Sequence, residues 1–301
     1  MTWLAPLDIG LMMGIIFAWA VLALALGFRL LNFPDLTVEG SLPLGAAVFS
    51  VMFRDGSSIP ISIITALLAG ALAGSLTALL HVRFRLNKFL AGIIVIAISY
   101  SLSLRVMGAA NIGLLQYGSF FEFVEPLDKM LSGFLHLGTI SFLGTVLLIS
   151  MIVLFVGLSS RMGTRLRVAG SNPEYARTLG ISVPLNTIFG LAVFNSLAAF
   201  SGVLLAVQQG FADISMGQGV LILALAAMAI GERLLPERRL PYQMFVVLSA
   251  SLGSILYQVV IAYAIRLGLA PTDLRLATAL LVLLVVAISV SRDRDLFAEG
   301  Y

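Results

Sequence analysis

The sequence predicts an all-α polytopic membrane protein with about eight to nine transmembrane helices, some broken or re-entrant, in two pseudo-repeated halves. Hydrophobic residues make up 60% of the chain and charged residues 11%, and the mean hydropathy is +1.06. Soluble domains are about 45–50% apolar and about 25% charged, so this composition places nearly the whole chain in a bilayer. The chain is also divided into apolar runs of about 20 residues, the length of a membrane-spanning helix, by short links that carry arginine.

Composition also excludes several kinds of site. The chain contains no cysteine, which rules out disulfides, thiolate metal sites and thiol nucleophiles. His81 and His136 fall on opposite sides of the predicted membrane, and no cluster has metal-ligand spacing. A phosphate loop of the form G-x-x-x-x-G-K-[ST] is missing, so the chain cannot hydrolyse ATP alone. We therefore predict no catalytic residue, no metal site and no nucleic-acid partner.

The apolar runs predict the spans in order. The N-terminal stretch lacks the basic region and small-residue cleavage site of a signal peptide, so we expect it to belong to a retained span. Two of the apolar runs are shorter than a full span, and they end at Phe53 and Ile230. The full-length predicted spans cover residues 9–26, 59–80, 89–107, 139–158, 185–207, 242–265 and 274–290.

We predict one transmembrane domain over residues 1–301, with a first half 1–158, a cytoplasmic segment 159–184 and a second half 185–301. The sequence FPDLTV at Phe33–Val38 is echoed by FADISM at Phe211–Met216. Each copy follows a span and leads into a short, glycine-containing apolar run. Paired interrupted helices in two halves indicate a transport path, although coincidence also explains so short an echo.

The basic links predict the orientation in the membrane. The links 81–88, 161–180 and 232–240 and the C-terminal tail are all basic, and even numbers of crossings separate them. By the positive-inside rule all four can face the cytoplasm of a bacterial inner membrane. The segment 108–138 and the turn around Pro271 then face outside.

The position of the N-terminus depends on the apolar run 42–53. If this run crosses the membrane fully, the chain makes about nine crossings and the N-terminus is outside. Arg29 near the inner face favours this arrangement. If the run is re-entrant, the N-terminus is inside.

Polar side chains in or beside the spans are the candidates for a solute path. Asp35 and Glu39 are spaced i, i+4, so in a helix they would share a face and could bind a proton, a cation or a substrate amine. Alternatively, both simply cap the helix that follows. Asn195 and Ser196 lie in the middle of a predicted span, where they either line a path or hydrogen-bond to a neighbouring helix. Tyr100 could stack on a ligand or anchor its span at the membrane interface.

The stretch 161–181 is the longest one in the second half that is not a span, and it is strongly basic. Asn172 can cap a helix, Pro173 fits the first helical position, and Gly180 provides the stop. We predict a short helix over residues 173–179 that lies parallel to the membrane and offers a docking surface to a soluble partner. An ordinary amphipathic loop helix is the alternative.

The residues EYARTLG at Glu174–Gly180 resemble the E-A-A-x-x-x-G coupling motif of ABC importer permeases. Tyr175 departs from the second motif position, and the downstream part of the longer motif is absent. The longer segment NPEYARTLGI resembles the coupling segment of the branched-chain amino acid and ribose-type permeases. Further blocks along the chain resemble the tryptophan/tyrosine-type branch of that family, namely LNFPDLTVEGSLPLGAA, GIIVIAISYSLSLRVMGAANI, GFADISMGQGV and IRLGLAPTDLRL.

The resemblance implies a homodimeric permease with two cytoplasmic ATPase subunits and an external substrate-binding protein. It implies alternating access for a small solute such as an aromatic amino acid, with ATP and Mg bound by the ATPase and no cofactor in this chain. The residues that would meet the ATPase are Asn172, Pro173, Glu174, Tyr175, Ala176, Arg177, Leu179 and Gly180. The candidate path residues are Asp35, Thr37, Glu39, Ser41, Tyr100, Asn195, Asp213 and Ser215.

Two other classes of protein remain open at this point. An ion-coupled secondary transporter using Asp35 and Glu39 would fit an inverted repeat, but it should carry more ionisable groups deep in its spans. It would also leave the capped cytoplasmic helix unexplained. An intramembrane enzyme or assembly factor is the other class, and the missing catalytic cluster argues against it, so we predict that the chain is not an enzyme.

Overall fold

Apolar runs form long helices throughout the part of the chain that is described. The computed structural model describes residues 5–117, 136–235, 240–269, 273 and 276. Within these residues six helices are long and apolar enough to cross a membrane, which supports a multi-pass membrane protein. They are α1 (Ala5–Leu31), α3 (Ile59–Phe84), α4 (Lys88–Met107), α6 (Leu137–Ser159), α9 (Val183–Gln209) and α11 (Tyr242–Arg266). The predicted span 274–290 lies outside the described residues, apart from Leu276.

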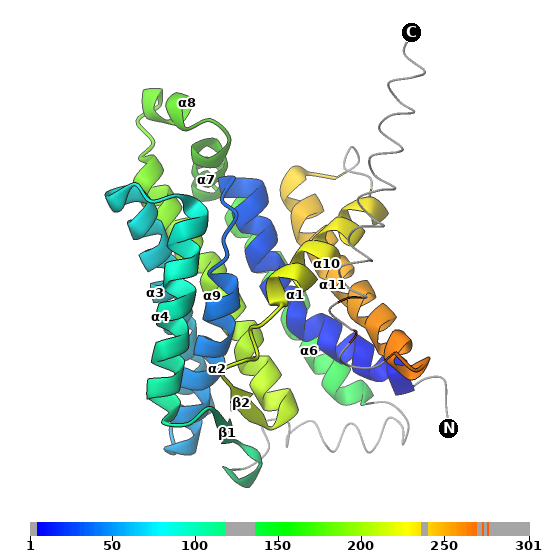
Figure 1. Ribbon diagram of the computed structural model, residues 1–301. Helices are drawn as coiled ribbons and strands as arrows, with labels where there is room; N and C mark the ends of the chain where they lie inside the picture. Colours follow the sequence, from blue (N-terminus) through cyan, green and yellow to red (C-terminus); the bar gives the residue numbers. More distant parts are fainter. Residues whose placement is uncertain (1–4, 118–135, 236–239, 270–272, 274–275, 277–301) are drawn as a thin grey trace.

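Four shorter helices and two short strands complete the fold (Figure 1). The helices are α2 (Val38–Arg54), α7 (Arg161–Ser171), α8 (Pro173–Thr178) and α10 (Val220–Leu234), and a 3-10 turn covers Leu115–Tyr117. The strands are β1 (Asn111–Gly113) and β2 (Phe211–Asp213). Because α2 and α10 are shorter than a full span, the predicted total of about eight to nine crossings is not established.

The two strands correct the all-α prediction. β1 and β2 pair antiparallel, with Asn111 opposite Asp213 and Gly113 opposite Phe211. They follow α4 and α9, and both helices end at a glycine with positive φ, Gly108 and Gly210. The extended residues beyond these stops have no helical hydrogen bonds, so they satisfy their backbone groups by pairing with each other.

Helix α1 is the centre of the bundle. Of its most apolar window, 78% is buried inside the single chain, against 11% for α6. It packs against α9, α10 and α11. Trp19 is fully buried and meets Phe200 of α9 edge to face, with the ring centroids 5.1 Å apart. Ser201 of α9 donates a hydrogen bond to the carbonyl of Ile16, 2.8 Å away, which adds a polar link of the kind that joins membrane helices.

Glycines bring α9 against α2 and α3. A methyl group added at Gly202 would overlap the carbonyl oxygen of Leu42 in α2. One added at Gly74 of α3 would overlap the carbonyl oxygen of Leu191 in α9. Small residues let membrane helices approach until their backbones touch, which is the main source of packing where no water can drive association.

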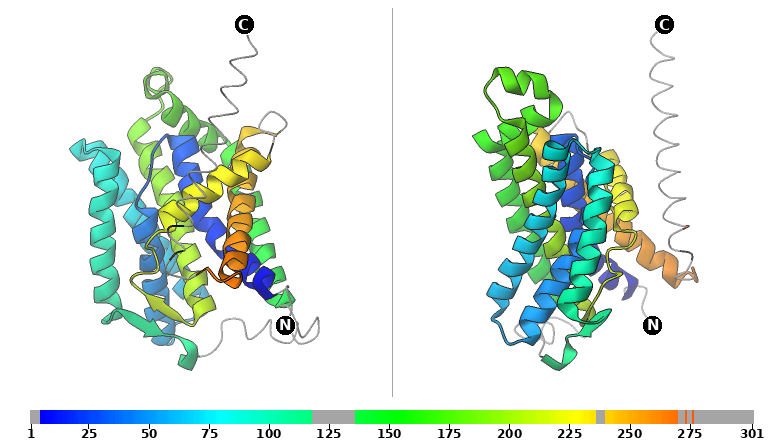
Figure 2. Two further views of the ribbon diagram at one scale, coloured as in Figure 1. Left: turned by 45° about the vertical axis from the view of Figure 1, so that its right-hand side comes forward. Right: turned by 60° about the vertical axis from the view of Figure 1, so that its left-hand side comes forward.

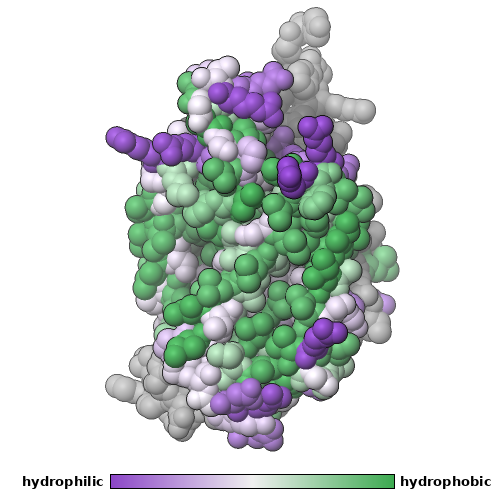
Figure 3. All heavy atoms as spheres, turned by 90° about the vertical axis from the view of Figure 1, so that its left-hand side faces the viewer, coloured by the Kyte–Doolittle hydropathy of each residue, from purple (hydrophilic) through white to green (hydrophobic). Residues whose placement is uncertain are grey.

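The outside of the bundle is apolar around its middle. Figure 2 shows α3 and α4 on one flank and α10 and α11 on the other. On the flank of α3 and α4, Figure 3 shows a broad hydrophobic band between two more hydrophilic ends. Leu72 of α3, for example, is 71% exposed. A continuous exposed apolar surface of this kind is expected to contact lipid or another membrane protein.

The basic links share one end of the bundle. Figure 1 places α7 and α8 at the same end as the link between α3 and α4 and as the last turn of α10. Arg29, near the end of α1, joins this end by donating a hydrogen bond to Glu232 of α10, with Nε and Oε1 2.7 Å apart. The start of α1 and the strand pair lie at the opposite end. The grouping of these links agrees with the predicted topology, and the C-terminal tail lies outside the described residues.

Helices α2 and α10 both start inside the bundle. Each follows non-helical chain, residues 32–37 before α2 and residues 210–219 before α10. Figure 1 shows both helices beginning near the middle of the bundle and running toward opposite ends. Their first turns meet, because Glu39 of α2 accepts a hydrogen bond from the backbone N–H of Gly219, 2.8 Å away. Two interrupted helices are therefore present as predicted, while a full pseudo-repeat of the two halves is not established.

Candidate functional site

Helix α8 forms where the sequence has a capping asparagine, a proline at the first helical position and a terminating glycine. The Asn172 side chain accepts a hydrogen bond from the Tyr175 N–H at 2.9 Å, and Pro173 occupies the first helical position. The helix ends at Thr178, one residue earlier than predicted, with Leu179 as its C-cap and Gly180 at φ +71°. The predicted helix and its caps are confirmed.

Seven of the eight predicted coupling residues, in α8 and its flanking caps, are exposed. Tyr175 and Leu179 are large apolar side chains that are 55% and 54% exposed. Glu174 and Arg177 are exposed beside them, while Ala176 is buried beneath the helix. Exposed tyrosine and arginine side chains, here Tyr175 and Arg177, are enriched in protein interfaces, so α8 is a candidate docking surface.

A second helix, α7, holds α8 on the bundle, and the sequence prediction missed it. The Ser160 side chain caps its start by accepting a hydrogen bond from the Met162 N–H at 3.2 Å. Its buried face consists of Gly163, Leu166, Ala169 and Gly170, a spacing of three to four residues. That helical periodicity was the available signal, but the segment is too polar to resemble a span.

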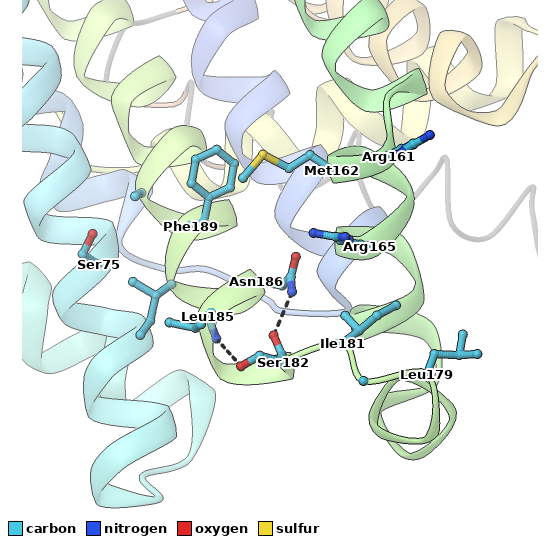
Figure 4. A pocket seen from close by; sticks show the side chains of 13 residues that line it. Ser75, Arg161, Met162, Arg165, Leu179, Ile181, Ser182, Leu185, Asn186 and Phe189 are labelled. Atoms are coloured by element: carbon cyan, nitrogen blue, oxygen red, sulfur yellow. Dashed lines mark hydrogen bonds between the residues drawn. The ribbon is translucent and has the colours of Figure 1, made fainter.

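A cavity of about 1060 Å³ lies between α7, the segment after α8, and the first turns of α9 (Figure 4). Arg165 extends from α7 toward α9, whereas Arg161 points away from the cavity. The Ser182 carbonyl accepts a hydrogen bond from the Asn186 side chain at 2.7 Å and fixes the start of α9. Among the described residues, Arg161 and Arg165 both line the cavity, and the Arg165 side chain extends across it toward α9.

A polar network lies at the point where the chain enters α2. Asn195 of α9 donates to Asp35 Oδ2 at 2.6 Å and accepts from the Ser41 hydroxyl at 2.7 Å. Asp35 Oδ1 accepts the Thr37 N–H at 2.9 Å. The Thr37 hydroxyl also lies 2.6 Å from that of Thr77 in α3. All five side chains are at most 1% exposed, so the network ties α2, α3 and α9 together.

The sequence left two interpretations of Asn195, namely that it lines a solute path or that it hydrogen-bonds to a neighbouring helix. The amide makes hydrogen bonds between helices, as polar side chains in membranes commonly do. The structure brings Asp35, Thr37, Ser41 and Asn195 together, a contact that the sequence did not predict, but none of them lines the cavity of about 470 Å³ between α2 and α4 that is described below. Their part in a solute path therefore stays a prediction.

Asp35 and Glu39 do not share a helical face, which the sequence predicted only for the case that both lie in one helix. Helix α2 begins at Val38, after its N-cap Thr37, so Asp35 precedes the helix and the i, i+4 spacing does not place the two carboxylates on one face. Asp35 binds Thr37 and Asn195, whereas Glu39 binds the Gly219 N–H. The physical reason is that Asp35 folds its side chain onto the backbone two residues ahead, a turn that competes with helix formation.

Glu39 and Tyr100 line a second cavity of about 470 Å³. Its walls come from the first turns of α2, from one face of α4, and from the segment 214–218 that leads into α10. Among the described residues, no group of three or more His, Asp or Glu side chains could hold a metal ion.

Asp213 is the last residue of β2, and Ser215 lies in the turn between β2 and α10. Asp213 Oδ1 accepts the Ser215 N–H at 2.7 Å, which repeats the arrangement of Asp35 with Thr37. The sequence echo is therefore also an echo of local structure. Sequence reasoning did not identify Thr77, and it did not predict that Gly219 meets Glu39, because both contacts join distant segments.

A multi-pass helical bundle whose two interrupted helices meet at a part-buried carboxylate defines a membrane transport protein. The family is shown by sequence comparison. A family model described as "Branched-chain amino acid transport system / permease component" matches residues 7–288, and the chain belongs to this family.

Three relatives show how the similarity is distributed. The chain is 32% identical over 261 residues to a tyrosine transport system permease protein of Clostridioides difficile (strain R20291), covering 86% of this chain and 83% of that one. It is 29% identical over 274 residues to the uncharacterized protein RP368 of Rickettsia prowazekii (strain Madrid E), covering 91% and 93%. It is 30% identical over 227 residues to the autoinducer 2 import system permease protein LsrC of Enterobacter sp. (strain 638), covering 73% and 63%. No solved structure matches the chain significantly.

These matches confirm the resemblance to ABC importer permeases that the coupling segment suggested. Members of this family are membrane transport subunits and are not themselves enzymes. Permeases of this type work in general with ATPase and binding-protein partners.

Proposed function

We propose that the chain is the permease subunit of an ABC importer that moves a small solute, an amino acid of the aromatic type. The observation that carries the proposal is α8, a capped helix that exposes Glu174, Tyr175 and Arg177 at the end where the basic links gather. The name of the tyrosine transport permease, 32% identical over 86% of this chain, supports the substrate class.

In this proposal α8 docks onto a cytoplasmic ATPase subunit, which binds ATP and Mg. Closure of two such ATPase subunits moves the α8 helices, and each α8 passes the movement to α9 through the short link 179–182. Asn195 of α9 is hydrogen-bonded to Asp35 and Ser41. A displacement of α9 would therefore also displace the start of α2. Transport then depends on the two states making different contacts with the partners.

The orientation and assembly follow from the same proposal. The end that carries α7 and α8 faces the cytoplasm, the start of α1 faces outside, and the C-terminus is cytoplasmic. An external binding protein delivers the solute to the opposite end. The cavity beside α2 is open on its α4 side in a single chain, because Tyr100 and Ile93 are 46% and 54% exposed. A second copy of the permease would close the path.

The proposal is tested by removing the charges of α8. Glu174→Ala with Arg177→Ala should lower ATP-dependent tyrosine uptake about tenfold or more, because central charged contacts dominate many interfaces. The ATPase subunit should also be lost from the purified complex, while membrane insertion is unchanged. Arg83→Ala is the matched control, an exposed arginine at the last turn of α3 outside α8.

Normal uptake and normal ATPase recovery in the α8 variant would contradict the coupling role. Uptake that survives ATP depletion but collapses with an uncoupler would instead support an ion-coupled transporter.

A further inference from the structure

Among the described residues that line the cavity beside α2, Glu39 is the one with a charged side chain. The other polar residues of this described lining are Tyr100, Ser101 and Gln218. Pro43 and the isoleucines of α4 supply the apolar wall. Solute sites are commonly mostly apolar cavities of about 300–1,000 Å³ with a few polar groups that fix orientation, and the volume of about 470 Å³ falls in that range.

Glu39 lies where the first turns of two helices meet. It is in the first turn of α2 and accepts the N–H of Gly219, which caps the start of α10. In the described part of the chain this N–H is its one hydrogen-bond donor, bound to Oε1, and a carboxylate has further acceptor capacity at Oε2.

A carboxylate with a free oxygen in an apolar cavity recognises an ammonium group. The charge-assisted hydrogen bond between them is among the stronger polar contacts in proteins, and it is strengthened where water is scarce. Tyr100 also lines the cavity, and a tyrosine hydroxyl can donate to a solute carboxylate. The isoleucines at 93 and 96 offer an apolar surface to the rest of the solute.

We infer that this cavity is a solute-selecting site inside the permease, where Glu39 binds the protonated amine of an amino acid whose apolar body lies against α4. The inference rests on the proposed importer function. It adds that the permease, as well as the external binding protein, selects the solute. Solutes that lack an ammonium group bind less well, because Glu39 Oε2 would lose water without gaining a donor.

Glu39 also joins α2 to α10, so a purely structural role must be separated from recognition. Glu39→Gln keeps a side-chain oxygen that can accept the Gly219 N–H and removes the charge. A structural clamp would survive this change, whereas ammonium binding would not. Asp55→Asn is the matched control, because Asp55 is an exposed acid at the far end of α2 that pairs with Arg54.

The experiment measures binding of three probes to the purified permease in nanodiscs by saturation-transfer NMR, without binding protein. Tyrosine and tyramine carry the ammonium group, and 3-(4-hydroxyphenyl)propionate lacks it. We expect the first two to bind the native chain and the Asp55→Asn variant, with affinity reduced about tenfold or more in Glu39→Gln, as loss of a charged hydrogen bond predicts. Equal binding of all three probes, or unchanged tyrosine binding by Glu39→Gln, would overturn the inference.

ATP-dependent tyrosine uptake by the reconstituted importer distinguishes failure of the selection site from failure of the importer function. If the native complex transports with ATP and Glu39→Gln does so equally well, the importer function stands and the selection site fails. If the native chain neither associates with an ATPase nor transports with ATP, the proposed function fails.

Discussion

At the scale of single residues, Asn195 joins the two halves of the chain. Its amide nitrogen donates to Asp35 and to the Leu191 carbonyl, and its oxygen accepts from Ser41. Water cannot replace these partners in a fully buried site, and a buried polar network stabilises a membrane protein only when each member is satisfied. The network therefore specifies where the non-helical segment before α2 is held.

Asn195→Ala should destabilise the protein by about 1–3 kcal/mol, because it leaves Asp35 and Ser41 with unmet hydrogen bonds. Ser196→Ala is the control, since Ser196 donates only within its own helix, to Ala192. Thermal unfolding in detergent, followed by size-exclusion chromatography, measures both. An equal melting temperature for the two variants would contradict the role of the network.

Residue-level signals were reliable only where the contact is local. The caps Asn172 and Gly180 act within a few residues, so the sequence predicted them correctly. Asp35 and Asn195 are 160 positions apart, and nothing in either segment reveals the other. The i, i+4 rule failed for Asp35 because it assumes a helix, and the helix starts three residues later, at Val38.

At the scale of elements, close backbone contact decides how α9 packs. Gly202 touches the carbonyl of Leu42 in α2, so any side chain there would separate the helices. The sequence predicts that α9 is a span, but the partner of each glycine depends on which helices become neighbours. Periodicity identifies an element and its apolar character, whereas packing order is a property of the whole bundle.

Gly202→Val should destabilise the fold by about 1–3 kcal/mol or more, the cost of overfilling a packed interior. Gly144→Val is the matched control, because Gly144 of α6 has open space where the new side chain would extend. Both changes add the same β-branched residue inside a helix. Monodisperse yield and melting temperature are the measurements, and similar losses in both variants would show that helix propensity, not contact with α2, is responsible.

At the scale of the whole molecule, the fold gathers the basic links at one end and places the starts of α2 and α10 in the middle. The long apolar spans could be predicted from hydropathy because they depend on a one-dimensional pattern, whereas the number of crossings and the sidedness stay predictions. The meeting of Glu39 with Gly219, and the cavity beside it, could not be predicted, because they depend on how two distant broken helices are arranged.

The orientation can be measured directly, because the chain contains no cysteine and any introduced thiol is the only one. Tyr175 at the α8 end and Leu115 near the strand pair are 55% and 85% exposed, and the fully buried Ala20 serves as the control. With an impermeant maleimide, Leu115→Cys should react in spheroplasts, and Tyr175→Cys only in inside-out vesicles. Ala20→Cys should react in neither. Reaction of Tyr175→Cys in spheroplasts would instead place α8 outside the cell, where no cytoplasmic ATPase could reach it.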